Sequence, residues 1–246
     1  MFRIHAALML PAALFIFLWP AMGIANIFAN PINGDIQKRL AAAEENPAML
    51  CGGGVIYAPA VLQGLYRTRA FQPAWIGRGA PLPQADALLN AVRLADREGL
   101  KPEEYHLLEI MALIAEWRSH QDNNLQFSID KQIDLDFLLT DALVAYGFHL
   151  LNGRVDPDRL DPEWLSYPKD LYLNDVVENV MRTGNVEAAF QRLIPRDPLY
   201  RSLKQTLAVY ANIARTGGWP LIPQPRGLKK KVDDSGYLSL LRQRLL

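Results

Sequence analysis

Apolar residues recur at helical spacing wherever their pattern is regular, and this constrains the fold more than any other feature of the chain. Ala85, Leu88, Leu89, Val92 and Ala95 fall on one face of a helix. We find no run of alternating apolar and polar residues long enough to indicate a sheet. The sequence therefore predicts an all-α, multi-helix fold.

Similar stripes predict further helices. They consist of Leu107, Met111 and Ile114; Leu135, Leu139, Ala142, Tyr146 and Leu150; Leu173, Val176, Val177 and Val180; and Leu199, Leu203, Leu207 and Tyr210. Another short helix is expected over 186–193. Gly99 and Pro102 separate the first two helices, because glycine commonly ends a helix and proline suits its first turn. Gly153 ends the long helix of the set.

Residues 1–25 have the parts of a secretory signal peptide. Arg3 precedes an uncharged apolar run that ends in Gly23-Ile24-Ala25, a small-residue pattern that favours cleavage after Ala25. The alternative is a retained membrane anchor, since the run is about as long as the roughly 20 residues that span a bilayer. Both interpretations predict an exported protein.

The charge balance argues against nucleic acid as a partner. Lys plus Arg and Asp plus Glu number 26 each, so the surface offers no strong electrostatic attraction to phosphates. The basic run at 229–231 is short and is expected to be a solvated loop. The three aspartates within 156–162 do not match a calcium loop, and no histidines have the spacing of a zinc site. We predict no metal and no cofactor.

Cys51 is the single cysteine, which excludes an internal disulfide. A thiol enzyme needs a stabilised thiolate with a base close to it, and no histidine is near Cys51 in the sequence. We interpret Cys51 as a small, partly buried thiol, with a nucleophile or a disulfide to another chain as alternatives.

The remaining polar candidates also predict no catalytic residue. We expect three acids to complement a helix dipole: Glu103, Glu104 and Glu109. Four others are expected on the exposed side of a helix: Asp130, Asp134, Asp136 and Asp141. We expect His120 in a polar loop at 119–128 and His149 as a hydrogen-bonded core residue. Trp75, Trp117, Trp164 and Trp219 are expected between helices, with stacking on sugar rings as the alternative. Arg69 and Arg154 are interpreted as structural clamps rather than ligands for peptide carboxylates.

Four stretches together carry a family resemblance. They are 65–75 (LYRTRAFQPAW), 91–106 (AVRLADREGLKPEEYH), 138–142 (LLTDA) with 153–157 (GRVDP), and 217–223 (GGWPLIP). In this order they resemble the helical scaffold domain of the large Gram-negative L,D-transpeptidases, which cross-link peptidoglycan.

The resemblance implies a periplasmic protein of wall assembly. The family's reaction uses a cysteine within Ser-x-Gly-Cys-x-Arg and an upstream His-Gly motif, and neither motif occurs here. Cys51 matches no catalytic position of the family. The implied function is therefore a non-catalytic scaffold portion in peptidoglycan cross-linking and remodelling. Its implied partners are peptidoglycan, a catalytic transpeptidase domain or another wall-synthesis protein.

The predicted organisation has four parts: a signal peptide at 1–25, a helical scaffold domain at 26–218, a proline-rich linker at 219–232, and at 233–246 the start of an incomplete module similar to peptidoglycan-binding modules.

Two other functions remain as alternatives. Residues 184–189 are similar to part of a helix-pair repeat and suggest a periplasmic adaptor unrelated to the wall, although no period near 34 residues recurs. A helical wall hydrolase would need an acid and base pair, and none stands out.

Overall fold

The computed structural model describes residues 31–45, 51, 55–77, 79–155, 170–219, 221 and 235–245. These residues are mainly helical, which confirms the all-α prediction. Their strands β1 (Ile76–Gly77) and β2 (Ala80–Pro81) form a minimal antiparallel pair. The predicted signal peptide and most of the predicted linker lie outside the described residues. None of the described helices has both the length and the apolar character needed to cross a membrane.

A helix forms over each predicted stripe, and helices also form at 31–45 and 59–68, where no stripe was predicted. They are α1 (Pro31–Glu45), α2 (Pro59–Thr68), α3 (Pro83–Arg93), α4 (Leu107–Asp122), α5 (Ile129–Asn152), α7 (Asp170–Thr183), α8 (Val186–Gln191), α9 (Pro198–Arg215) and α10 (Ser235–Leu245). Two 3₁₀ turns, η2 (Ala95–Glu98) and η3 (Pro102–Tyr105), join α3 to α4. Gly99 ends η2 with a φ of 75°, a conformation that glycine adopts without strain.

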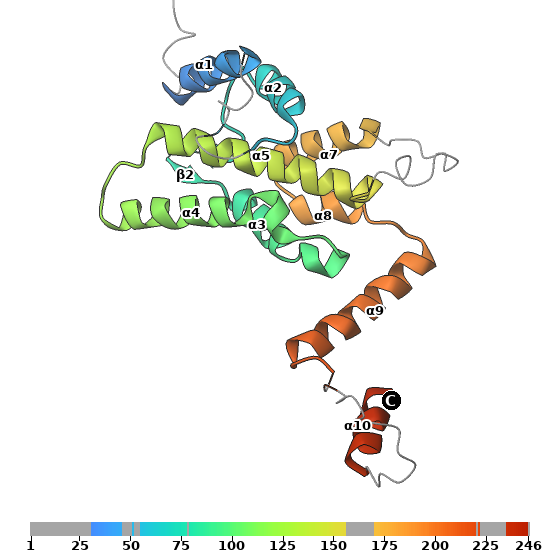
Figure 1. The fold of residues 1–246 in the computed structure, drawn as a ribbon. Coiled ribbons are helices and arrows are strands. Elements are labelled where there is room, and N and C mark those ends of the chain that lie inside the picture. Colours follow the sequence, from blue (N-terminus) through green and yellow to red (C-terminus); the bar gives the residue numbers. More distant parts are fainter. Residues whose placement is uncertain are drawn as a thin grey trace, which may run out of the picture.

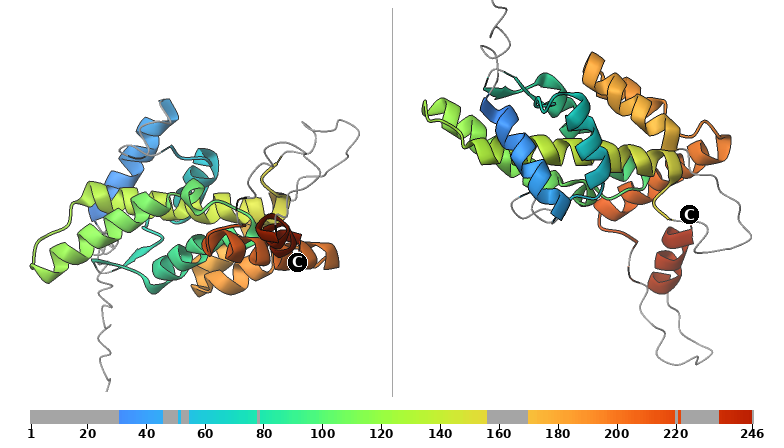
Figure 2. Two further views of the ribbon diagram at one scale, coloured as in Figure 1. Left: turned by 60° about the horizontal axis from the view of Figure 1, so that its bottom comes forward. Right: turned by 90° about the horizontal axis from the view of Figure 1, so that it is seen from above.

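The long helix α5 lies at the centre of the body. It contacts α1, α2, α3, α4 and α7, which surround it in Figures 1 and 2. The predicted stripe of α5, including Leu135, Leu139 and Ala142, is buried as expected. Phe137 and Val144, on the opposite side of α5, are buried as well, because a helix packed on several sides needs apolar side chains around most of its circumference.

The prediction that the aspartates of α5 face solvent is wrong for Asp136 and Asp141. Both are fully buried. Asp141 accepts hydrogen bonds from the backbone N–H groups of Tyr57 and Ala58, at 3.0 and 2.8 Å. Buried polar groups need such partners, so these carboxylates fasten the segments beside α2 to the central helix.

The two aspartates near the amino-terminal end of α5 are more exposed. Asp130 is largely exposed and Asp134 is partly buried, and both pair with Arg39 of α1. The same helix therefore carries solvated acids at its end and buried acids in its middle.

Two smaller predictions near α4 also need correction. Met111, which we expected in the core, is partly exposed, and its neighbour Ile110 is buried there. The predicted polar loop at 119–128 begins only after α4 ends at Asp122, and it contains buried Phe127. Phe127 stacks on Trp117 with a centroid separation of 4.7 Å, so this aromatic pair anchors the loop.

Candidate functional site

The predicted helix at 198–215 forms, but its apolar stripe is not buried. Pro198 suits the first turn, and the side chain of Asp197 caps it by accepting the N–H of Leu199 at 2.6 Å. No residue of α9 is buried. The exposed fractions of the four large apolar side chains are 67% for Leu199, 61% for Leu203, 58% for Val209 and 54% for Tyr210.

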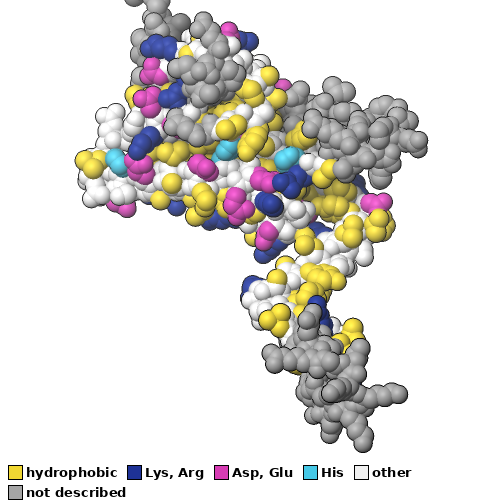
Figure 3. All heavy atoms as spheres, in the orientation of Figure 1, with side chains coloured by type: hydrophobic (Ala, Val, Ile, Leu, Met, Phe, Trp, Pro, Cys, Tyr) yellow, Lys and Arg dark blue, Asp and Glu magenta, His cyan; other side chains and the backbone are white. Residues whose placement is uncertain are grey.

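This exposed face of α9, defined by Leu199, Leu203, Val209 and Tyr210, extends away from the body. In Figure 1 the helix leaves the end of α8 and points away from α5, and Figure 3 shows apolar side chains along it. At 100° per residue, these four side chains share an arc that contains no charged residue. Contiguous apolar surface of this kind marks interaction sites in soluble proteins.

The opposite edge of α9 is attached to the body at η2. The carboxylate of Glu98 accepts hydrogen bonds from the hydroxyl of Tyr200, at 2.6 Å, and from Lys204. Burial and the hydrogen bond to Glu98 raise the pKa of Tyr200 well above its ordinary value, so its hydroxyl stays protonated as a donor. Leu207 lies over Gly99. These contacts orient α9 and leave its apolar face uncovered.

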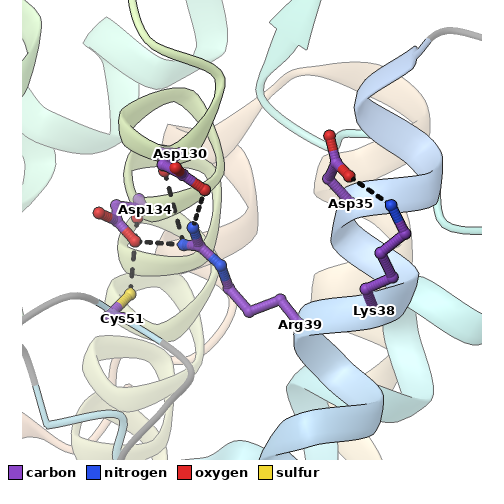
Figure 4. Close-up of polar contacts among 6 residues, drawn as sticks. All are labelled: Asp35, Lys38, Arg39, Cys51, Asp130 and Asp134. Carbon is purple, nitrogen blue, oxygen red and sulfur yellow. Dashed lines mark hydrogen bonds and ion pairs between the residues drawn. The ribbon is translucent and has the colours of Figure 1, made fainter.

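Cys51 lies beside α5, next to Asp134 (Figure 4). It is buried, and its Sγ is 3.8 Å from the carbonyl oxygen of Asp134. Burial raises the pKa of Cys51 to about 12, and the negative charge of Asp134 adds to the shift. A reactive thiol needs its pKa lowered, so this geometry agrees with an inert, buried thiol.

The histidines serve the packing of the body. His149 Nδ1 is 2.9 Å from the hydroxyl of Tyr105, as expected for a hydrogen-bonded histidine, and burial lowers the pKa of His149. His120 lies within α4 rather than in a loop. Sequence reasoning missed the contact of His106 Nε2 with Asp141, at 2.7 Å, because the two residues are far apart in the chain.

No group of three His, Cys, Asp or Glu side chains suited to a metal ion occurs in the part of the chain that the structure describes. The predicted acidic connector at 156–162 and the basic run at 229–231 lie outside that part. Glu104, which we predicted to complement a helix dipole, pairs with Arg154.

The tryptophans and the two arginines are largely structural. Trp75 and Trp117 are buried between helices, as predicted, whereas Trp219 is 44% exposed and meets Tyr210 edge to face. Trp164 lies outside the described residues. Arg69 donates to the carbonyl oxygen of Pro73 at 2.9 Å, which makes it a clamp of the turn after α2, and Arg154 clamps η3 through Glu104.

Comparison with known families places the helices from α2 to the first half of α9 in one unit. A family model described as Scaffold domain matches residues 60–207, more than half of the chain. The chain belongs to the scaffold-domain family. This is the scaffold domain of L,D-transpeptidase-like proteins, so the resemblance found in the sequence is confirmed. No curated protein and no solved structure matches the chain.

The scaffold domain therefore includes the start of the exposed face. The match begins in α2 and ends within α9, so it contains Glu98 and the first exposed leucines, Leu199 and Leu203. The attachment of α9 and the beginning of its apolar face lie inside the matched region. The family match supports a scaffold role.

Proposed function

We propose that this protein is a periplasmic scaffold in peptidoglycan cross-linking, and that the exposed face of α9 holds a catalytic transpeptidase domain. The observation that carries the proposal is an apolar helix face that is fixed in orientation yet uncovered. Membership of the scaffold-domain family supports the choice of partner. In this proposal the partner domain supplies the reactive thiolate, because Cys51 is buried and has a raised pKa.

The chemistry of the face favours a protein surface with its own apolar groove or helix. Leu199 and Leu203 lie about one helical turn apart, and Tyr210 lies about two turns further on, a spacing with which an amphipathic helix enters an apolar groove. The attachment of Tyr200 and Lys204 to Glu98 holds α9 before the partner arrives. Such preorganisation lowers the entropic cost of association.

A charge placed on this face tests the docking. Binding of a purified catalytic L,D-transpeptidase domain would be measured by calorimetry with the wild-type chain and with Leu203→Lys. We expect at least a tenfold loss of affinity, about 1.4 kcal/mol, because an unpaired ammonium would be buried in the interface.

Gln205→Lys is the matched control. It adds the same charge to the same helix at an exposed position outside the apolar arc, so it should bind like the wild type. Equal affinities for Leu203→Lys and the wild type would reject the exposed face of α9 as the docking surface.

The link to the wall needs separate experiments. We expect the chain, mixed with the catalytic domain, to increase cross-link formation on isolated peptidoglycan and to sediment with purified sacculi. An adaptor unrelated to the wall would do neither.

A second assay incubates the chain alone with tetrapeptide muropeptides, and release of the terminal D-alanine would reject a non-catalytic scaffold.

A further inference from the structure

A second surface feature lies where α8 leads into α9 (Figure 1). An open cleft of about 570 Å³ is lined there by Ile194, Pro195, Arg196, Tyr200, Arg201 and Lys204. This volume lies within the range of small-ligand sites, roughly 300–1,000 Å³. Its lining combines apolar side chains with three cationic ones.

The cations of this cleft differ in how they are paired. Glu98 holds Lys204 and the hydroxyl of Tyr200. Arg196 and Arg201, by contrast, have no hydrogen-bond or ion-pair partner for their side chains among the residues that the structure describes. A cleft lined by two guanidinium groups that lack a partner among the described residues offers positive charge to an anionic ligand.

A second cleft, between α2 and α7, lacks this spare charge. It is lined in part by Arg69, Glu178 and Arg182. Arg69 donates to the carbonyl oxygen of Pro73, and Arg182 donates to Asn179 at 3.0 Å. Its two arginines are therefore already engaged and Glu178 adds a negative charge, so of these two clefts the one between α8 and α9 is suited to an anion.

We propose that the cleft between α8 and α9 binds the free carboxyl terminus of a short peptide. Guanidinium groups pair with carboxylates through two parallel hydrogen bonds, and Arg196 and Arg201 are both available for this contact. Ile194 and Pro195 provide apolar surface for the side chain next to that carboxylate. This apolar surface favours a peptide end over inorganic phosphate, which has no apolar part. The proposal does not rest on the docking face of α9.

The test is an NMR titration of the full chain with four probes at equal ionic strength. N-acetyl-Leu-Ala with a free carboxylate should saturate, whereas its carboxyl-terminal amide should not bind. N-acetyl-glutamate with an amidated terminus tests whether a side-chain carboxylate is enough for binding. Inorganic phosphate tests whether any anion binds. If N-acetyl-glutamate amide or inorganic phosphate binds as tightly as N-acetyl-Leu-Ala, the assignment to a peptide carboxyl terminus is overturned.

Substitutions then locate the site. Arg201→Gln should weaken binding of the peptide acid at least about fivefold, and Arg201→Lys should recover only part of it, because an ammonium lacks the paired geometry of the guanidinium. Arg215→Gln is the control: it removes the same charge from an exposed position on the same helix. Equal affinities for Arg201→Gln and Arg215→Gln would overturn the proposal.

The two proposals fail separately. Leu203→Lys should leave binding of the peptide acid unchanged, and Arg201→Gln should leave binding of the transpeptidase domain unchanged. We expect each variant to remain soluble and helical, because each substitution replaces an exposed side chain. Circular dichroism checks that condition.

Discussion

We expect Asp136→Ala to lower the free energy of unfolding by about 3–5 kcal/mol, because it removes an acceptor shared by several buried donors. The carboxylate of Asp136 accepts the hydroxyl of Tyr66 and the backbone N–H groups of Ala74 and Trp75, the latter two at 2.9 and 2.7 Å. All of these groups are buried. This single side chain therefore joins α5 to the segment that follows α2.

The magnitude follows from the donors that lose their partner. The hydroxyl of Tyr66 keeps an acceptor, because it is also 2.9 Å from Thr140 Oγ1. Each buried donor left without an acceptor costs about 1–3 kcal/mol, so the amides of Ala74 and Trp75 set a range of about 2–6 kcal/mol. Water entering the space of the lost carboxylate would lower this cost, and the cavity left by the side chain would raise it, so we expect a value in the middle of that range. A domain of ordinary stability, about 5–15 kcal/mol, would remain folded only marginally.

Urea unfolding followed by circular dichroism measures this effect. Asp130→Ala is the matched control on the same helix, because the side chain of Asp130 is 82% exposed and its pairing with Arg39 contributes little. We expect the control to change the free energy of unfolding by less than about 1 kcal/mol. Equal costs for the two variants would refute the assignment of a structural role to the buried carboxylate.

The pH dependence provides an independent check on Asp136. Burial raises the pKa of Asp136 above its ordinary value of 3.8, although the hydrogen bonds from Tyr66 and the two amides oppose the shift. The folded state then holds the proton more tightly than the unfolded state, so stability falls as pH rises from about 4 towards the folded-state pKa. Asp136→Asn cannot titrate, so its stability relative to the wild type should increase over that interval. A constant difference would contradict the raised pKa.

Three further predictions concern the remaining features. Cys51, buried and with a pKa of about 12, should react with iodoacetamide at pH 8 at least about 100-fold more slowly in the native chain than in urea, as followed by mass spectrometry; equal rates would contradict its burial. Deleting residues 198–246 should shift the Tm of the body by less than about 5 °C, because no residue of α9 is itself buried; loss of cooperative unfolding in calorimetry would contradict this. Gly99→Ala should cost about 1 kcal/mol in urea unfolding because of its positive φ, whereas Gly64→Ala, within a helix and facing open space, should stabilise slightly; the reverse order would contradict this argument.

Helix positions were predictable because their signals are local. The stripe of Ala85, Leu88, Leu89 and Val92 is buried as its spacing predicts. Gly99 separates the first two helices as expected. A stripe recurs within a few residues, so its interpretation does not require knowledge of distant parts of the chain.

Burial of individual polar residues was not predictable in the same way. Asp136 and Asp130 are the same residue type on one helix, yet one is fully buried and the other is exposed. The difference arises from the elements packed around the middle of α5, which come from remote parts of the sequence. The contact between His106 and Asp141 was missed for the same reason.

The sequence by itself determined the all-α class, the main helices and the family, because helical periodicity and short motifs are properties of neighbouring residues. Only the tertiary structure decided that Cys51 is enclosed and that two carboxylates of α5 fasten the core. It also decided that the apolar face of the strongly amphipathic helix α9 stays largely exposed, with Trp219 as an edge contact to Tyr210. Spacing along a chain shows which side of a helix is apolar, whereas burial depends on what the rest of the fold brings against that side.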